Sequence, residues 1–378
     1  MDYILHLNNY NDTLRRAKRA VYLFSVLTPM QKTTFLLFLV FSILTGVLSY
    51  NFYQSIYGEL ITKDCIVFIG SSDTMSAVEK TLSKNLDNEQ NSTTNTIPKF
   101  NWLAHQKNFS KPKAGKYILT KGMSLNDVVN LFRSGNQTPI KVSFNNQDTL
   151  EKFSGRISSQ IEADSITILE VFKDSIFLRN NKLTIASVLG IIIPNTYEFY
   201  WNVSAENFRN KLLKEYNKFW NKERLTKASL LKLSREEVIT LASIVQKETV
   251  KTIERPIVAG LYLNRIKRGI PLQADPTIIY ILKKRNGTDF QVKRVLYKDL
   301  KIASPFNTYL NKGLPPNLIA MPDISSIDAV LNYKKHNYIY MCASVTKFGF
   351  HEFASTLLQH NKNATRYQRW LNKKGINR

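Results

Sequence analysis

One carboxylate stands on the apolar stripe of a predicted helix, where an aliphatic residue is the usual choice. The segment 238–249 carries Leu241, Ile244 and Val245 at the spacing of a single helical face, and Glu248 falls on that same face. A carboxyl group held against an apolar wall is disfavoured as the anion, so its pKa rises and it can serve as a general acid near neutral pH. The same spacing also fits a helix that simply reaches the surface, with Glu248 solvated.

Two predicted helices position this carboxylate. The first covers 234–249, where Ser234 and Glu237 stand at capping-box spacing. The second covers 255–268 and places Pro256 in its first turn, where the missing N–H of proline has no cost. We therefore expect Glu248 at the end of one helix, a short turn before the next.

Polar loops that contain proline follow the second helix. Segment 271–277 leads into a predicted helix, and segment 304–309 reads Ser-Pro-Phe-Asn-Thr-Tyr. A buried strand is predicted over 338–343, and 350–353 precedes a helix that we expect to end near 360–361. Loops of this composition often carry binding residues that a rigid scaffold positions.

A long uncharged run near the N-terminus predicts a membrane span. No charged residue occurs from Thr33 to Gly58, and about 20 apolar residues suffice to cross the hydrocarbon core. A signal peptide is the alternative, but a long segment precedes the run and no small-x-small cleavage site follows it. By the positive-inside rule, 1–32 is predicted to be cytoplasmic, 33–57 to span the membrane, and the rest to lie outside. The basic residues that set this orientation are Arg15, Arg16, Lys18, Arg19 and Lys32.

The composition of the chain limits the classes of partner that it is expected to bind. The 378 residues carry a formal net charge of +24, which points to an anionic partner. Nucleic acid is excluded by the predicted location outside the membrane and by the absence of a recognisable nucleic-acid motif in the sequence. Anionic lipid head groups or an acidic wall polymer fit better, and a merely solvated lysine-rich surface is the alternative. The two cysteines, Cys65 and Cys342, form no disulfide framework, and their redox state is left open.

The chain past the span divides into a small module and a larger domain. The module, 58–140, is predicted to contain strands at 65–69 and 114–119, a polar loop over 84–97, and a helix that Ser124 caps. Nothing in it has catalytic character, so a binding or spacing module is the natural interpretation.

The larger domain is predicted over 141–378. Its first part is helical to about residue 221, interrupted by 191–200, where Pro194 ends any regular element. The aromatic residues behind Pro194 are interpreted as core, with a sugar-stacking surface as the alternative. The fold class is α+β: an N-terminal transmembrane helix, the small α/β module and a mixed α+β catalytic domain.

These residues match a known family in order and at compatible spacing. Segment 242–249, Ala-Ser-Ile-Val-Gln-Lys-Glu-Thr, resembles the catalytic helix of the endolytic murein transglycosylases, the YceG-like (MltG) family. Many members carry Glu where this chain has Gln246. The small module resembles the family's LysM-like module. Further matches are Asn264-Arg265, 272–277, 304–309, 313–316, Ile319, Pro322, His351-Glu352-Phe353 and His360-Asn361.

The resemblance implies an activity and one catalytic residue. Members cleave the MurNAc–GlcNAc β-1,4 bond inside nascent peptidoglycan strands and leave a 1,6-anhydro-MurNAc end. Glu248 occupies the position of the catalytic Glu and would act first as acid and then as base, with no cofactor and no metal. The implied location is the bacterial inner membrane, and peptidoglycan synthases are possible partners by similarity.

The matched loop residues are expected to bind substrate. Gln273, Asn307 and Tyr309 would hydrogen-bond sugar hydroxyl or acetamido groups, or else satisfy loop backbone. Asp275 is interpreted as a helix cap, with a catalytic group as the alternative, and His351 is either a cleft residue or a buried, hydrogen-bonded histidine. The full expected set is Gln273, Asp275, Ser304, Asn307, Thr308, Tyr309 and His351.

Two other functional classes and two structural details complete the predictions. A hydrolase would use Glu248 with Asp275 or Glu254 and water, and a catalytically inactive scaffold would only bind peptidoglycan. Glu254 and Arg265 are predicted to form an ion pair. His351 and His360 do not form a zinc pair, because no His-Glu-x-x-His motif occurs.

Overall fold

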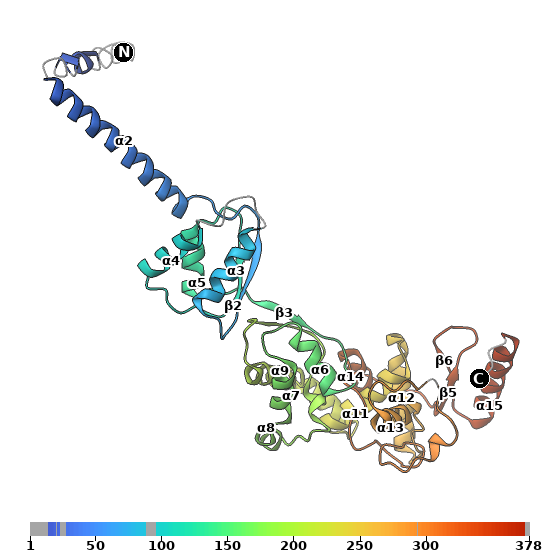
Figure 1. Ribbon diagram of the computed structural model, residues 1–378. Coiled ribbons are helices and arrows are strands. Elements are labelled where there is room, and N and C mark those ends of the chain that lie inside the picture. The colour runs from blue at the N-terminus through green and yellow to red at the C-terminus, as the bar shows by residue number, and fades with distance from the viewer. Residues whose placement is uncertain (1–13, 20, 23–27, 88–95, 293, 375–378) are drawn as a thin grey trace. The chain divides into compact units, whose positions relative to one another are not determined.

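A computed structural model describes residues 14–19, 21–22, 28–87, 96–292 and 294–374. The chain separates into two compact units, Met1–Thr138 and Pro139–Arg378 (Figure 1). Much of the predicted cytoplasmic segment 1–32, and residues 88–95 of the predicted loop, lie outside the described residues.

The first unit contains one long apolar helix, α2 (Pro29–Tyr57). Thr28 and Gln31 form a capping box at its start, so the helix begins four residues before the predicted span. The mean hydropathy of its most apolar window is 2.0, which makes it long and apolar enough to cross a membrane by length and composition alone. Its last turn buries Ile56 against the module that follows.

The module is built on a two-stranded antiparallel sheet. Strand β1 (Cys65–Ile69) pairs with β2 (Gly115–Leu119), as predicted for both strands. Three helices supply the rest of its core: α3 (Met75–Asp87), α4 (Thr96–Gln106) and α5 (Leu125–Ser134), the last with the predicted Ser124 cap.

The predicted loop over 84–97 was partly wrong. Helix α3 continues to Asp87, and α4 begins at Thr96. The apolar residues of α4, Phe100 and Leu103, are buried in the module's core, which stabilises this short helix although its sequence has no strong helical period.

The second unit opens with helices around a second small sheet. Strands β3 (Ile140–Ser143) and β4 (Thr196–Phe199) pair antiparallel. Tyr197 and Phe199 are buried, which confirms the core interpretation for them, whereas Tyr200 is exposed. The helical elements of this part are α6 (Leu150–Ser158), α7 (Ser165–Lys173), α8 (Ser175–Asn180), η2 (Val188–Ile191), α9 (Ala205–Phe219) and α10 (Lys222–Leu230).

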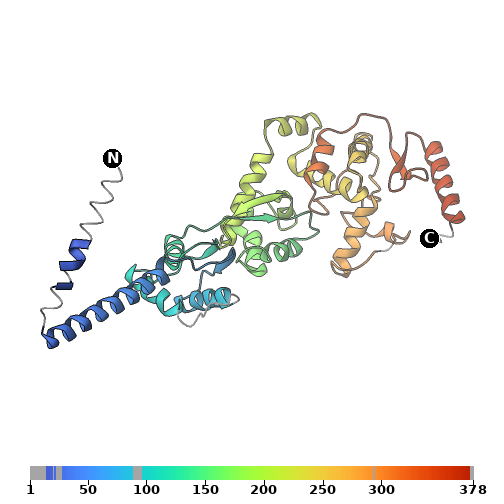
Figure 2. The same ribbon diagram turned by 90° about the horizontal axis from the view of Figure 1, so that it is seen from above.

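Helix α11 (Arg235–Glu248) is the central element of the unit. Nine consecutive residues, Val238–Gln246, are buried, because α12, α13 and α14 pack around the helix. The surrounding elements, seen from above in Figure 2, are η3 (Thr252–Glu254), α12 (Arg255–Lys267), α13 (Asp275–Asn286), η4 (Asp299–Lys301) and α14 (Ile324–Leu331).

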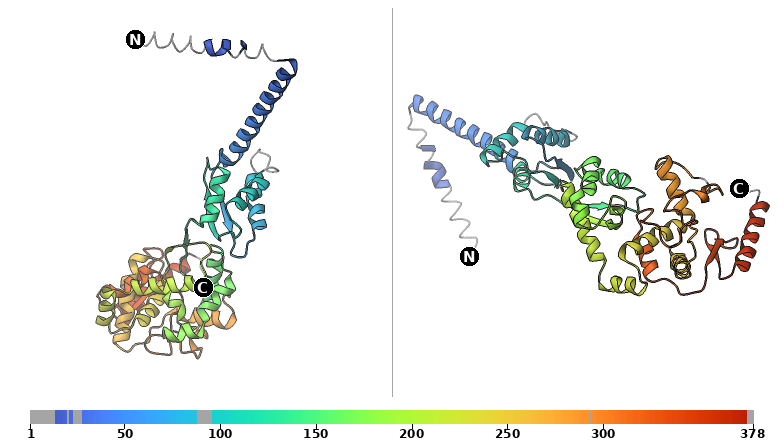
Figure 3. Two further views of the ribbon diagram at one scale, coloured as in Figure 1. Left: turned by 90° about the vertical axis from the view of Figure 1, so that its left-hand side faces the viewer. Right: turned by 90° about the horizontal axis from the view of Figure 1, so that it is seen from below.

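The chain ends in a hairpin and one helix. Strands β5 (Tyr340–Ala343) and β6 (His351–Ala354) pair antiparallel, and α15 (Leu357–Lys373) packs beside them (Figure 3). The prediction of a helix ending near 360–361 was wrong: the helix begins just before that point, with Thr356 as its cap. The predicted strand at 338–343 starts two residues later and is only half-buried.

A close backbone approach fixes the irregular segment that leads into this hairpin. A Cβ at Gly260 would lie 2.4 Å from the Lys334 carbonyl oxygen and 2.7 Å from His336 Nε2, so only glycine fits there. Asn264, one helical turn later, donates from Nδ2 to the carbonyls of His336 (2.7 Å) and Tyr338 (3.0 Å). Helix α12 therefore positions the hairpin that carries His351.

Candidate active site

Helix α11 ends at the carboxylate that the sequence singled out. Ser234 caps the helix, with Glu237 completing the capping box, as predicted. Leu241, Ile244 and Val245 are fully buried, and Glu248 is the last helical residue. The residue as a whole is partly accessible, so the group is desolvated on its protein side and still reachable from outside.

Tyr262 holds the Glu248 carboxyl group. Its hydroxyl donates to Glu248 Oε1 at 2.6 Å, and its ring is buried in α12, with 1% of its surface exposed. Burial raises the pKa of Glu248 to about 7; the Tyr262 hydrogen bond opposes this rise, and the charge of Asp275 adds to it. Near neutral pH this carboxyl group is divided between its acid and its anion, as acid–base catalysis requires.

Removing the Tyr262 hydroxyl should raise the pKa of Glu248 above about 7, because that hydroxyl stabilises the carboxylate. A ¹³C NMR titration of the labelled Glu248 side chain in Tyr262→Phe measures the change. Tyr197→Phe is the matched control, since Tyr197 is also buried but donates to the Ile193 carbonyl instead. A pKa of Glu248 that falls in Tyr262→Phe would contradict this account of the bond.

Asp275 and Tyr309 form a second hydrogen-bonded pair close to Glu248. The Tyr309 hydroxyl donates to Asp275 Oδ1 at 2.5 Å. Burial and the adjacent Asp275 carboxylate raise the pKa of Tyr309, so it stays a neutral donor. The interpretation of Asp275 as a helix cap was wrong: Ala274 is the cap position, and Asp275 is the first residue of α13, with its carboxylate exposed.

Arg265 fixes the loop that carries Gln273. Its buried guanidinium donates to the Pro271 carbonyl (2.8 Å), the Ile339 carbonyl (2.9 Å) and Gln273 Oε1. Gln273 adopts the left-handed conformation with φ 53°, and its N–H donates to the Thr308 carbonyl. The predicted Glu254–Arg265 ion pair is therefore wrong, because Arg265 is committed to these acceptors.

Glu254 pairs with His351 instead. The Glu254 carboxylate, 3% exposed, accepts from the His351 N–H (2.7 Å), contacts His351 Nδ1 (2.8 Å) and accepts from the Thr249 hydroxyl (3.0 Å). Burial alone would lower the pKa of His351, but the Glu254 carboxylate outweighs it and raises that pKa. His351 is partly exposed, and its charge lowers the pKa of Glu248, so it belongs to the same group.

Three of the expected substrate-binding residues serve the loop. Asn307 is fully buried and uses its amide on the carbonyls of Leu300 and Ile302 and on the N–H of Tyr309. Thr308 is also buried, and its hydroxyl accepts from the Ala274 N–H and contacts Thr277. Ser304 accepts from the Phe306 N–H. Asn307 thus has the loop-backbone role given above as the alternative to sugar binding, and substrate contact by Asn307 and Thr308 stays a prediction.

Gln246 has a structural task that needs an amide. Its Nε2 donates to the Met321 carbonyl (3.2 Å), and its Oε1 accepts from the Asp323 N–H (2.5 Å) and the Ser326 hydroxyl (3.2 Å). A carboxylate has no donor for the Met321 carbonyl. Gln246 thus links α14 to α11 through hydrogen bonds. As an amide, it does not supply a second acid beside Glu248.

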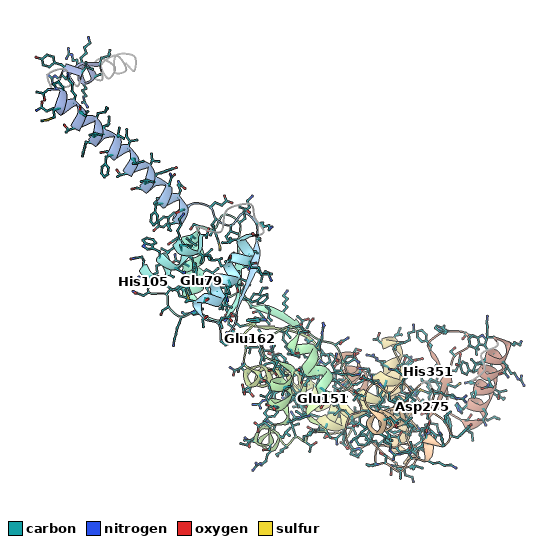
Figure 4. The ribbon with its side chains drawn as sticks, viewed as in Figure 1. Glu79, His105, Glu151, Glu162, Asp275 and His351 are labelled. Atoms are coloured by element: carbon teal, nitrogen blue, oxygen red, sulfur yellow. The ribbon has the colours of Figure 1, made fainter. Side chains whose placement is uncertain are left out.

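The site therefore consists of five side chains from three helices, one loop and one strand: Glu248 of α11, Tyr262 of α12, Asp275 of α13, Tyr309 of a loop that follows α13, and His351 of β6. Figure 4 labels Asp275 and His351 among the side chains of the second unit. In the part of the chain that the structure describes, no group of three His, Cys, Asp or Glu residues could hold a metal ion.

One residue and one pairing of this site are not predicted from the sequence. Tyr262 stands three residues before Arg265 on a helix whose middle is apolar, so both polar groups fall on one face, and this spacing is the signal that points to Tyr262. The pairing of Glu254 with His351 had no such signal, because 97 residues separate them.

One pocket of this unit lies beside this group and not around it. Its volume is about 400 Å³, and Lys247 and Pro276 contribute to its lining, whereas Glu248 and Asp275 do not. We place the candidate active site at the carboxylates, because the perturbed pKa and the converging hydrogen bonds are there.

An acid at a helix end, a tyrosine that holds it and polar loops around both are features that this chain shares with one protein family. The chain matches the YceG-like family model over residues 67–366 and belongs to that family.

Relatives and a solved structure agree. The endolytic murein transglycosylase of Bacillus subtilis is 28% identical over 315 residues, covering 79% of this chain and 83% of the relative. That of Streptococcus pneumoniae serotype 2 is 27% identical over 295 residues, so the chain spans about half (53%) of that relative's length. The crystal structure of a YceG-like protein from Listeria monocytogenes gives a TM-score of 0.52 at 26% identity, covering 79% of this chain and 98% of that one.

Proposed function

We propose that this protein is a membrane-anchored endolytic lytic transglycosylase of peptidoglycan, with Glu248 as its general acid and base. The observation that carries the proposal is a carboxyl group with a pKa of about 7, held by Tyr262 at an accessible helix end. Relatives named endolytic murein transglycosylase support the substrate and the reaction class.

The proposed reaction needs one carboxyl group. Protonated Glu248 donates its proton to the glycosidic oxygen as the bond from that oxygen to C1 of MurNAc breaks. The resulting carboxylate then takes the proton of the C6 hydroxyl while O6 forms a bond to C1. The products are a 1,6-anhydro-MurNAc end and a free GlcNAc end, and Glu248 regains its proton. General acid–base catalysis of this kind contributes about 10²–10⁴-fold, and the positioned C6 hydroxyl adds an effective-molarity gain.

The neighbouring side chains tune and orient this step. Tyr262 fixes the Glu248 carboxyl group, and the charge of Asp275 keeps the pKa of Glu248 raised. We expect Tyr309 and the exposed amide end of Gln273 to hydrogen-bond sugar hydroxyl or acetamido groups. Glu254 holds His351 in place, and we expect His351 to contact the glycan strand from the β5–β6 hairpin.

The apolar helix α2 supports a proposed location for the protein. We place α2 across the bacterial cytoplasmic membrane, with the N-terminus in the cytoplasm and with the small module and the second unit outside, where peptidoglycan is made. The small module, 58–140, then serves as the LysM-like module that binds the wall or acts as a spacer. Peptidoglycan synthases are the proposed protein partners.

Mass spectrometry of glycan strands digested by the protein tests the activity. We expect internal cuts with 1,6-anhydro-MurNAc ends. Reducing MurNAc ends would replace the proposal by a hydrolase that uses Asp275 and water. Intact strands would leave a protein that only binds peptidoglycan.

Asp275→Asn should retain substantial cleavage, because the amide still accepts from Tyr309 and no second carboxylate is required. Since the charge of Asp275 raises the pKa of Glu248, the variant should lose activity at a lower pH than the parent as pH increases. The pH profile of kcat/KM measures this displacement. Complete loss of cleavage in a folded Asp275→Asn protein would favour the hydrolase.

A further inference from the structure

A lysine-rich pocket adjoins the candidate active site. It measures about 400 Å³ and combines an aliphatic wall, including Leu189, Ile279 and Leu318, with charged groups at its rim. Ile185, 61% exposed, also lines it. We call this cavity the lysine pocket. Its charged residues are Lys173, Lys247, Lys283, Lys284, Asp148 and Glu151.

The charges of the lysine pocket do not balance. Asp148 accepts from Lys247 at 2.6 Å and from Lys283 at 3.4 Å, so one carboxylate serves two ammonium groups. Glu151 pairs with Lys173 at 3.1 Å. Lys284 Nζ lies 5.6 Å from the centroid of the Phe306 ring, and no carboxylate oxygen of the described residues lies within 4.0 Å of it. Four lysines and two acids leave a surplus of two positive charges beside an apolar wall.

The pocket and the catalytic group share their supporting elements. Lys247 is the chain neighbour of Glu248 on α11, and Pro276 is the chain neighbour of Asp275 on α13. Consecutive side chains of a helix diverge by about 100°, so Lys247 and Glu248 point to neighbouring faces of α11. A long substituent of a sugar bound at Glu248 is therefore needed to span from the carboxylate to the pocket.

We propose that the lysine pocket binds the acidic peptide branch that murein strands carry on their muramic acid residues, which makes peptide-bearing strands the preferred substrate. This inference rests on the proposed function. The surplus ammonium groups match the peptide's free carboxylates. The aliphatic wall matches its alanine methyl groups, and Asp148 and Glu151 can accept from its amide or amino groups. A polyprenyl pyrophosphate is the competing occupant, but it has no amide or amino groups that Asp148 and Glu151 could accept from.

Selectivity between two matched substrates tests the inference. Strands with intact peptides and strands stripped by an amidase are digested by the full-length protein, and kcat/KM is compared. We expect about a tenfold preference for peptide-bearing strands, the loss expected when one charge-assisted contact is removed. Lys283→Gln with Lys284→Gln should bring the ratio toward one, whereas Lys214→Gln with Lys218→Gln on α9 should not.

A binding measurement separates this inference from the proposed function. Calorimetric titration of full-length Glu248→Gln protein with a free acidic stem tetrapeptide needs no cleavage. We expect binding that weakens with salt and is lost in the Lys283/Lys284 double variant. Absence of binding, equal cleavage of both strand types, or preference for farnesyl pyrophosphate as probe would each overturn the inference. Peptide binding without cleavage of any strand would refute the proposed function instead.

Discussion

Glu248→Gln should reduce strand cleavage by about 10²–10⁴-fold, the contribution of a general acid–base group. Glutamine keeps the shape of the side chain and can still accept from Tyr262. It has no acidic proton to give to the leaving oxygen, and its neutral amide cannot take the proton of the C6 hydroxyl. Mass spectrometry of strand ends over a time course measures the loss. Glu236→Gln, at the exposed start of the same helix, is the matched control and should cleave like the parent.

The same variant has a stability signature that shows it is folded. Because the pKa of Glu248 is about 7 in the folded chain and 4.5 in the reference state, the folded protein keeps a proton that the unfolded chain releases between these values. Wild-type stability therefore falls as pH rises from about 4.5 to about 7. Glutamine does not titrate, so Glu248→Gln should be more stable than wild type above pH 7, on the order of 1–3 kcal/mol, with the gain shrinking toward pH 4.5. Full cleavage by Glu248→Gln would refute the assignment of this residue.

Arg265→Met should destabilise the second unit by roughly 3–5 kcal/mol, because three acceptors lose a charged donor. Those acceptors are the carbonyls of Pro271 and Ile339 and the side chain of Gln273. Gln273 would also lose the contact that holds its left-handed conformation. We expect the thermal unfolding midpoint of the unit to fall by roughly 10 °C and strand cleavage to fall with it.

A neighbouring arginine provides the control. Arg268 lies at the exposed end of α12, so Arg268→Met removes the same charge without removing buried hydrogen bonds. Arg265→Lys tests geometry, because an ammonium group cannot reproduce the planar fork of the guanidinium group. Equal unfolding midpoints for Arg265→Met and Arg268→Met would show that the buried network contributes little.

Several features of the site follow from local sequence. The cap at Ser234 and the apolar face of α11 depend on spacings of three and four residues, and the structure has both as predicted. Those spacings also place Glu248 at the accessible end of the helix. The two strands of the first unit were predicted correctly because short apolar segments bounded by turns define them.

Predictions failed where one segment depends on another that is distant in the chain. Helix α4 is stabilised by the module's core, and the 351–354 strand exists because 340–343 pairs with it. The sequence left open whether Asn307 binds sugar or satisfies loop backbone, and the fold brings its buried amide to the carbonyls of Leu300 and Ile302.

The sequence by itself determined the acid, its helix and the family's ordered loops, because these depend on residue type and on short, regular spacing. Only the tertiary structure decided that Tyr262 holds Glu248, that Glu254 serves His351 and not Arg265, and that lysines from separate elements share one pocket. Hydrogen bonds and desolvation act through space over a few ångströms, whereas their partners stand up to 97 residues apart in the chain.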